Sequence, residues 1–466
     1  MAEISKTSNF HVVMFPWLAV GHMTPFLQLA NKLAERGCST SLLLTDKAIQ
    51  QLNHFNHHPC LIKFHSLVLP HVEDLPVGTQ TASDIPIHLT HFLSIAMDRT
   101  RDQLEQVIRE TKPKFIFYDM AHWVPQIAKP LGIKTINFVV VCAASIAIVT
   151  VPARNICKDM AIAEEELSEP PTGYPSSVVV LRRHEARLLT FVFQPFGEGI
   201  TFYERICTGL RECDAIAIRT CRETEGKMCD YIESQYKKPV FLTGPLLDEP
   251  VNAPLEDRWV KWLSRYEPGS VVFCSFGSQC ILEKSQFQEL VLGLELSGFP
   301  FLVALKKPMG VSTIEEALPE GFEERVRGRG VVCGEWVQQV MFLDHPSVGC
   351  FVSHCGFGSM WESLMSNCQI VLVPQLGDQI LNTRLLAEEI KVAMEVERDE
   401  NGWFQKENLS KAIKTVMDKD GELGATVMKN HAKWRETLKN QRFMSNYVDK
   451  FIQNMRLIVR SSEATI

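Results

Sequence analysis

Short apolar runs alternate with amphipathic helical patterns along most of the chain, and this alternation is the strongest constraint on its fold. In the first half the helical pattern after the first run begins, by our interpretation, with Thr24 as its cap and Pro25 in its first turn. Strands that alternate with helices predict an open parallel sheet with helices on both faces. The runs of strand type in this half lie at residues 11–16, 39–44, 115–118 and 135–141.

The second half repeats the same rhythm. Its apolar runs lie at residues 271–276, 301–305, 330–334, 350–353 and 370–373, with helical patterns at 285–296 and 379–390. A chain of 466 residues is too long for one ordinary core. We therefore predict the α/β class, with two doubly wound, Rossmann-like parallel-sheet domains that face a cleft. The first domain spans 1–244, a proline-rich and acidic linker 245–254 and the second domain 255–440, and an amphipathic helix at 441–466 packs back on the first domain.

The overall composition is that of an ordinary soluble protein. Hydrophobic residues make up 45%, charged residues 22%, and the net charge is -7, which gives no reason to expect nucleic acid or an anionic membrane as a partner. The longest apolar stretch, 138–152, is short for a membrane span, and we interpret it as a buried strand that runs into a helix. The 14 cysteines are scattered and form no Cys-x-x-Cys pair, which favours reduced thiols and a cytoplasmic location.

A glycine-containing turn, Gly356-Phe357-Gly358-Ser359, follows one apolar run and precedes a helical pattern. Small residues let the backbone approach a ligand closely, and the free amides at a helix start favour phosphate. His354 and Ser359 can add hydrogen-bond donors, and Glu362 can accept hydrogen bonds from ribose hydroxyls. Taken alone, such a turn is more often plain structure, and the Gly-x-Gly-x-x-Gly spacing of dinucleotide sites is absent.

Polar and aromatic residues also follow the two neighbouring runs. Trp336 offers an indole that can stack on a planar base, with Gln339 beside it, although a lone tryptophan there is more often part of the core. Asp378 and Gln379 place a carboxylate next to an amide, which together can accept from and donate to sugar hydroxyls. The structural alternative for Asp378 is a helix N-cap.

In order and spacing, the segment from Trp336 to Gln379 resembles the plant secondary product glycosyltransferase box of the UDP-dependent glycosyltransferases. The matching positions are Trp336, Gln339, His345-Pro346, Gly349, Phe351-Val352, His354-Cys355-Gly356, Ser359, Glu362-Ser363, Pro374 and Asp378-Gln379, with Asn382 just beyond. Three further motifs fall where that family has them, namely Gly21-His22 with Pro25, Gly244-Pro245 and the run from Ser275 to Ser278.

The resemblance implies the two-domain GT-B fold, an acceptor-binding first domain and a UDP-sugar-binding second domain. It further implies inversion at the anomeric carbon, with His22 as general base and Asp119 as its partner. His122 is the alternative partner for His22. The residues implied to bind the donor are Ser278, Trp336, Val337, Gln339, His354, Gly356, Phe357, Gly358, Ser359, Glu362, Asp378 and Gln379.

The box departs from the usual pattern at several positions. Gln338 stands where proline is usual, Phe357-Gly358 replaces a Trp-Asn pair, and Met360-Trp361 replaces Thr-Leu. A side-chain contact from position 358 is therefore lost, while main-chain contacts to the phosphates can remain. This form of the box, and the segment 15–25, are similar to the branch that glycosylates sugars already attached to flavonoids or terpenoids.

The partners that follow are a UDP-sugar as co-substrate and a small acceptor, by resemblance the sugar of a flavonoid or anthocyanin 3-O-glycoside. We expect no cofactor and no metal, since the one Asp-x-Asp triplet (Asp418 to Asp420) ends a helical pattern and no ligand spacing is present. The lack of a heptad pattern favours a monomer. The alternatives are transfer to a free aglycone, a catalytically silent UDP-sugar-binding protein, and a dinucleotide enzyme, which the missing glycine fingerprint opposes.

Overall fold

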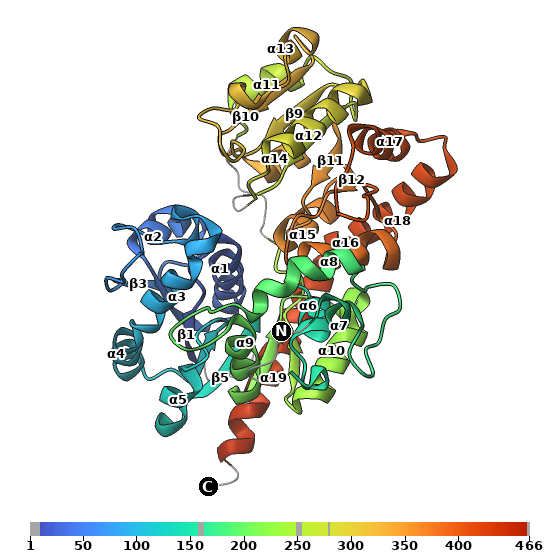
Figure 1. Ribbon diagram of the computed structural model, residues 1–466. Coiled ribbons are helices and arrows are strands. Elements are labelled where there is room, and N and C mark those ends of the chain that lie inside the picture. Colours follow the sequence, from blue (N-terminus) through green and yellow to red (C-terminus); the bar gives the residue numbers. More distant parts are fainter. Residues whose placement is uncertain (1–9, 157–162, 248–253, 278–279, 464–466) are drawn as a thin grey trace.

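The computed structural model describes residues 10–156, 163–247, 254–277 and 280–463, and it contains two parallel sheets (Figure 1). The first sheet has seven strands in the order β3-β2-β1-β4-β5-β6-β7, and every neighbouring pair is parallel. Its strands are β1 (His11–Phe15), β2 (Ser39–Leu44), β3 (Ile62–Ser66), β4 (Phe115–Tyr118), β5 (Lys134–Val139), β6 (Ala215–Ile218) and β7 (Val240–Leu242).

The second sheet has six strands in the order β10-β9-β8-β11-β12-β13, again all parallel. They are β8 (Val271–Ser275), β9 (Phe301–Ala304), β10 (Gly330–Cys333), β11 (Val348–Ser353), β12 (Gln369–Leu372) and β13 (Ala393–Glu395). Two doubly wound sheets confirm the predicted α/β class. Most of the predicted linker, residues 248–253, lies outside the described residues.

Helices cover both faces of each sheet. Around the first sheet lie α1 (Val20–Ala34), α2 (Asp46–Leu52), α3 (Thr90–Asp98), α4 (Arg101–Thr111), α5 (Val124–Ala128), α6 (Ala143–Val149), α7 (Glu164–Ser168), α8 (Arg183–Ala186), α9 (Phe202–Glu212) and α10 (Arg222–Tyr236). With the second sheet come α11 (Asp257–Leu263), α12 (Lys284–Ser297), α13 (Phe322–Arg325), α14 (Gln339–Leu343), α15 (Phe357–Met365), α16 (Gln379–Arg384), a π-helical turn η8 (Leu385–Glu389), α17 (Lys406–Met417) and α18 (Glu422–Lys439).

The last helix, α19 (Gln441–Glu463), returns to the first sheet (red in Figure 1). Its side chains Phe451 and Met455 are buried with those of β1 and β4, and the Phe451 ring lies 6.1 Å from that of Phe117 and 6.2 Å from that of Phe241. The two halves also share one buried cluster, in which Trp361 and Leu381 of the second half pack with Tyr118 of the first. Apolar burial of this kind holds the two sheets in one body.

The first helix begins five residues earlier than the sequence predicts. Thr24 does not cap it, because α1 starts at Val20 after a tight turn in which Ala19 accepts the main-chain N–H of His22. Pro25 lies inside the helix, and because proline has no N–H it cannot donate the helical hydrogen bond to the residue four positions earlier. The predicted strand-then-helix at 138–152 is confirmed as β5 followed by α6. Within the described residues, no helix combines the length and apolarity needed to cross a bilayer.

Both sheets reverse their strand order near the middle. In the first sheet the reversal lies between β1 and β4, and in the second between β8 and β11. At such a point the loops that leave the carboxyl ends of the two strands diverge to opposite faces and open a crevice between them. Ligands of doubly wound sheets bind at this place, so the loops after β1, β4, β8 and β11 are where a site is expected.

Candidate active site

His22 and Asp119 lie at the reversal point of the first sheet. His22 is the third residue of α1, shortly after β1, and Asp119 directly follows β4. His22 Nδ1 lies 2.6 Å from Asp119 Oδ2, and the His22 side chain stays 26% exposed while Asp119 is buried. A carboxylate on Nδ1 favours the tautomer that carries its hydrogen there, which leaves the Nε2 lone pair free to take a proton.

The Asp119 carboxylate is itself fixed by the main chain. Its Oδ1 accepts hydrogen bonds from the main-chain N–H of Trp17 at 2.7 Å and of Met120 at 2.6 Å. These amides orient the carboxylate toward His22 rather than toward His122. Sequence reasoning missed this support, because a backbone donor leaves no signature in the side chains.

The reversal point of the second sheet carries the predicted phosphate turn. His354, Cys355 and Gly356 connect β11 to α15, and the ring of His354 lies between this turn and Gly277 of the loop after β8. Burial lowers the pKa of His354 to about 4, so its imidazole is neutral at pH 7 and offers an N–H instead of a charge. Its Nδ1 is buried and has no hydrogen-bond partner among the described residues, which leaves it available to a ligand. Ser278 lies outside the described residues.

Close packing of His354 makes glycine necessary at position 356 but not at 358. A Cβ atom at Gly356 would lie 2.6 Å from His354 Nε2, whereas one at Gly358 would meet nothing within 4 Å. We therefore expect Gly356→Ala to raise the Kd for UDP about tenfold, because overpacking of 1–3 kcal/mol would displace the imidazole. Gly358→Ala, the matched control, should stay near the wild-type Kd. Calorimetry with UDP measures both, and equal Kd values for the two variants would contradict this account.

Three of the predicted donor residues form one hydrogen-bonded group. Gln339, the first residue of α14, donates from Nε2 to Ser359 Oγ at 2.9 Å and to Glu362 Oε2 at 2.6 Å, both on α15. The bond to Glu362 holds one carboxylate oxygen and fixes its direction, so the group can present acceptors to vicinal hydroxyls such as those of a ribose.

The aromatic and apolar members of the predicted set divide into exposed and buried side chains. Trp336 is 79% exposed, so the interpretation of this residue as a core tryptophan is wrong, and its indole face is open for stacking. Val337 and Phe357 are buried, and the Phe357 ring packs edge-on against Trp361 at 5.9 Å. Only the main chain of these two residues can therefore face a ligand. The open space at Gly358 is where a longer side chain would fit.

Asp378 and Gln379 begin α16, after β12. Gln379 Oε1 accepts the main-chain N–H of Gln375 at 3.0 Å and of Leu376 at 3.2 Å, so its amide nitrogen is the end left to face a ligand. Asp378 occupies the N-cap position of α16 but its side chain makes no capping hydrogen bond there, and the residue is half-buried. Burial raises the pKa of Asp378, while its hydrogen bond from Asn382 and the nearby His22 lower it. The two halves meet near these residues, since Leu18 of the turn after β1 and Ile380 of α16 belong to one buried cluster.

Among the described residues, no group of three His, Cys, Asp or Glu side chains could hold a metal ion.

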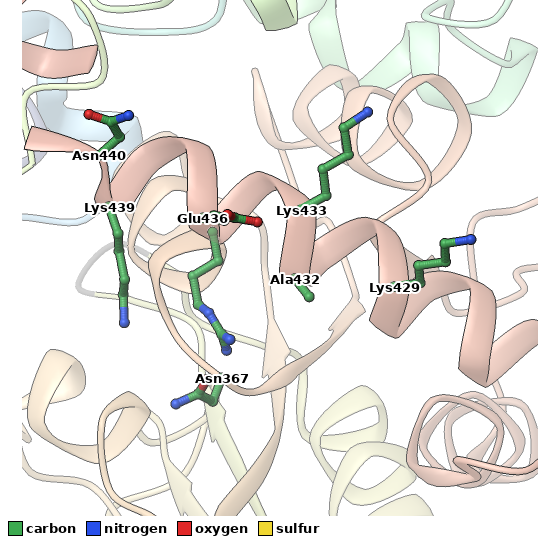
Figure 2. A pocket seen from close by; sticks show the side chains of 8 residues that line it. Asn367, Lys429, Ala432, Lys433, Glu436, Lys439 and Asn440 are labelled. Carbon is green, nitrogen blue, oxygen red and sulfur yellow. The ribbon is translucent and has the colours of Figure 1, made fainter. Parts of the chain in front are cut away.

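One further hollow lies apart from these loops. A shallow hollow on α18 and the Asn367 loop is lined by lysines and an arginine (Figure 2). Lys433 and Lys439 point to opposite sides of the helix, and no predicted site residue lines this hollow.

The chain is similar to known proteins over nearly its whole length. Residues 263–430 match the family model described as UDP-glucoronosyl and UDP-glucosyl transferase. The anthocyanidin 3-O-glucoside 2'''-O-xylosyltransferase of Arabidopsis thaliana is 56% identical, with 98% of this chain and 99% of that protein covered. UDP-glycosyltransferase 79B6 of the same plant is 55% identical, with 97% and 99% covered.

Solved structures agree in fold. UGT73P12 from Glycyrrhiza uralensis superposes with a TM-score of 0.80 at 20% identity, covering 98% of both chains, and UGT89C1 from Arabidopsis thaliana with 0.75 at 22%, covering 96% of this chain and 100% of that one. These neighbours confirm the GT-B fold. The identity to the curated relatives over almost the full length decides the family. The chain belongs to the UDP-dependent glycosyltransferases.

Proposed function

We propose that the enzyme transfers a sugar from a UDP-sugar, with inversion at the anomeric carbon, to a hydroxyl on the sugar of a flavonoid or anthocyanin 3-O-glycoside. The contact between His22 and Asp119 supports the chemical part of this proposal, since an imidazole paired with a carboxylate at the reversal point of the sheet can serve as a general base. The acceptor class is supported by the relative at 56% identity that acts on anthocyanidin 3-O-glucoside. Transfer to a free aglycone is the second candidate.

In the proposed mechanism, the acceptor hydroxyl donates its hydrogen bond to His22 Nε2. The acceptor oxygen attacks the anomeric carbon, the bond from that carbon to the UDP oxygen breaks, and UDP leaves with the electron pair. The proton moves to Nε2, and Asp119 stabilises the resulting imidazolium. The negative charge that develops on the leaving diphosphate is met by the amides at the start of α15, by His354 and by Ser359. We propose that this requires no metal ion.

We also place the enzyme in the cytoplasm and expect it to act as a monomer. The cysteines in the described part of the chain are free thiols, most of them buried, which suits a reducing compartment. Light scattering of the purified enzyme at working concentrations tests the monomer, and localisation of a fluorescent fusion in leaf cells tests the compartment.

The proposal predicts a product that gains one sugar from a glycoside without added metal. The purified enzyme is incubated with a panel of UDP-sugars and with quercetin, quercetin 3-glucoside or cyanidin 3-glucoside, in buffer with EDTA, and mass spectrometry follows the product. Products from the two glucosides alone support the proposal and name the donor. Products from quercetin alone favour the aglycone alternative. Activity that appears only after Mg²⁺ or Mn²⁺ is restored would contradict the metal-free mechanism.

A further inference from the structure

Asn382 is a buried side chain that joins the two loops on which the donor is expected to lie. It belongs to α16 and is fully buried. Its Nδ2 donates to the main-chain oxygen of Cys355 at 2.8 Å and to Asp378 Oδ2 at 3.1 Å. Cys355 is part of the phosphate turn after β11, whereas Asp378 belongs to the loop after β12, so one amide group spans both.

The turn at Cys355 needs such support. Cys355 has a φ of +61°, in the left-handed region that residues with a Cβ rarely adopt. Its N–H donates to Ser353 Oγ at 3.1 Å, and its carbonyl accepts from Asn382. Without the asparagine, this buried carbonyl would lose its hydrogen bond to α16 and the turn would lose one of its two local anchors. The same turn sets the direction of the His354 ring and of the Gly356 main chain.

Asp378 depends on the same amide. A hydrogen bond donated to a carboxylate favours its ionised form, and Asn382 therefore opposes the rise in the pKa of Asp378 that burial causes. An ionised carboxylate can accept hydrogen bonds from two sugar hydroxyls, whereas a protonated one has given up part of this capacity.

Asparagine is also a costly residue at this position. Its Oδ1 is buried and has no hydrogen-bond partner among the described residues. A leucine of similar size would fill the space without an unsatisfied oxygen. The two N–H donors, and not packing, therefore explain why an asparagine stands at this position.

We propose that Asn382 is a positioning residue that holds the phosphate turn and the sugar-facing Asp378 in register, and so sets the affinity for the UDP-sugar donor. This inference rests on the proposed function, in which the donor occupies these two loops. Asn382 does not touch the reacting atoms. Its loss should weaken donor binding and leave acceptor binding unchanged.

The test compares Asn382→Leu with Asn31→Leu. Asn31 is likewise buried and makes two hydrogen bonds, from Nδ2 to the main-chain oxygen of Phe55 and to Oδ1 from the main-chain N–H of His57. It lies in the last turn of α1, whereas His22 lies in the first. Both variants should lose comparable thermal stability. Only Asn382→Leu should raise the Kd for UDP and the KM for the UDP-sugar by about tenfold, with the KM for the acceptor near the wild-type value.

A Kd for UDP that is unchanged in Asn382→Leu, together with a lowered Tm, would show a purely structural role and overturn the inference. If Asn382→Leu does not fold, Asn382→Ser serves in its place, since a serine hydroxyl is too short to reach both acceptors, and an unchanged Kd there overturns the inference equally. Calorimetry with UDP needs no acceptor. If the wild-type enzyme binds UDP but modifies no glycoside, the proposed acceptor class is wrong, while the inference about Asn382 and donor binding can still be tested.

Discussion

Replacing His22 by alanine should reduce sugar transfer by about 10²–10⁴-fold, the usual contribution of a general base. The acceptor hydroxyl would have no group within reach to take its proton, while the donor residues on the second sheet would be untouched. The Kd for UDP should therefore stay near the wild-type value. Initial rates measured by chromatography of the product, beside calorimetry with UDP, check both halves of this expectation.

Two further variants sharpen the test. Asp119→Asn keeps the shape of the side chain but can present an N–H to His22 Nδ1, which would favour the wrong tautomer and lower kcat strongly. His122→Ala is the matched control, since His122 lies three residues from Asp119 and is partly buried, yet the carboxylate contacts His22. The His122→Ala variant should retain most of the transfer activity. Sugar transfer at the wild-type rate by His22→Ala would contradict the assignment of His22 as the general base.

Replacing Arg384 by leucine should lower the free energy of unfolding by about 3–5 kcal/mol, because it breaks a buried ion pair from one side. Arg384, at the end of α16, is 3% exposed and contacts Glu185 of the first half and Glu395 of β13. Glu185 is fully buried, and its other oxygen accepts the main-chain N–H of Arg182 at 2.8 Å. Without Arg384, this buried carboxylate would be left with its longer contact, 3.9 Å, to the partly exposed guanidinium of Arg182.

Arg182→Leu is the matched control for this prediction. Arg182 contacts the same two carboxylates, Glu395 at 3.2 Å and Glu185 at 3.9 Å, but its side chain is 44% exposed, so its removal should cost about 0–1 kcal/mol. Chemical denaturation measures both variants. The double variant Glu185→Leu/Arg384→Leu should recover part of the loss, since it removes Arg384 together with its fully buried partner, while Glu395 keeps its contact to Arg182. If Arg384→Leu and Arg182→Leu lower the free energy of unfolding equally, the ion pair between Arg384 and Glu185 is accessible to water in solution, which contradicts this prediction.

Sequence patterns were sufficient for most strands and insufficient for three of the four edge strands and for one helix start. The strongly apolar runs became β1, β2, β4, β5, β8, β9, β10, β11 and β12, within a few residues at most. The edge strand β3, whose sequence is Ile-Lys-Phe-His-Ser, mixes polar with apolar residues, and β7 and β13 are only three residues long, which is too short for a periodic pattern. Thr24 and Pro25 have the local chemistry of a helix start, but the turn after β1 starts α1 earlier, since tertiary contacts override a local preference.

The sequence by itself determined which residues stand at the ends of strands and the starts of helices, because the periods of 2 and 3.6 residues and the chemistry of turns are local properties. On that basis it predicted two doubly wound domains and a set of polar residues at their carboxyl edges. Only the tertiary structure decided which of these residues meet. His22 reaches Asp119, 97 positions away, because β1 pairs with β4, and Glu185 reaches Arg384, 199 positions away, because the two halves pack together. The left-handed backbone of Cys355 and the role of Asn382 likewise depend on contacts between loops that are distant in sequence, and no local pattern records such contacts.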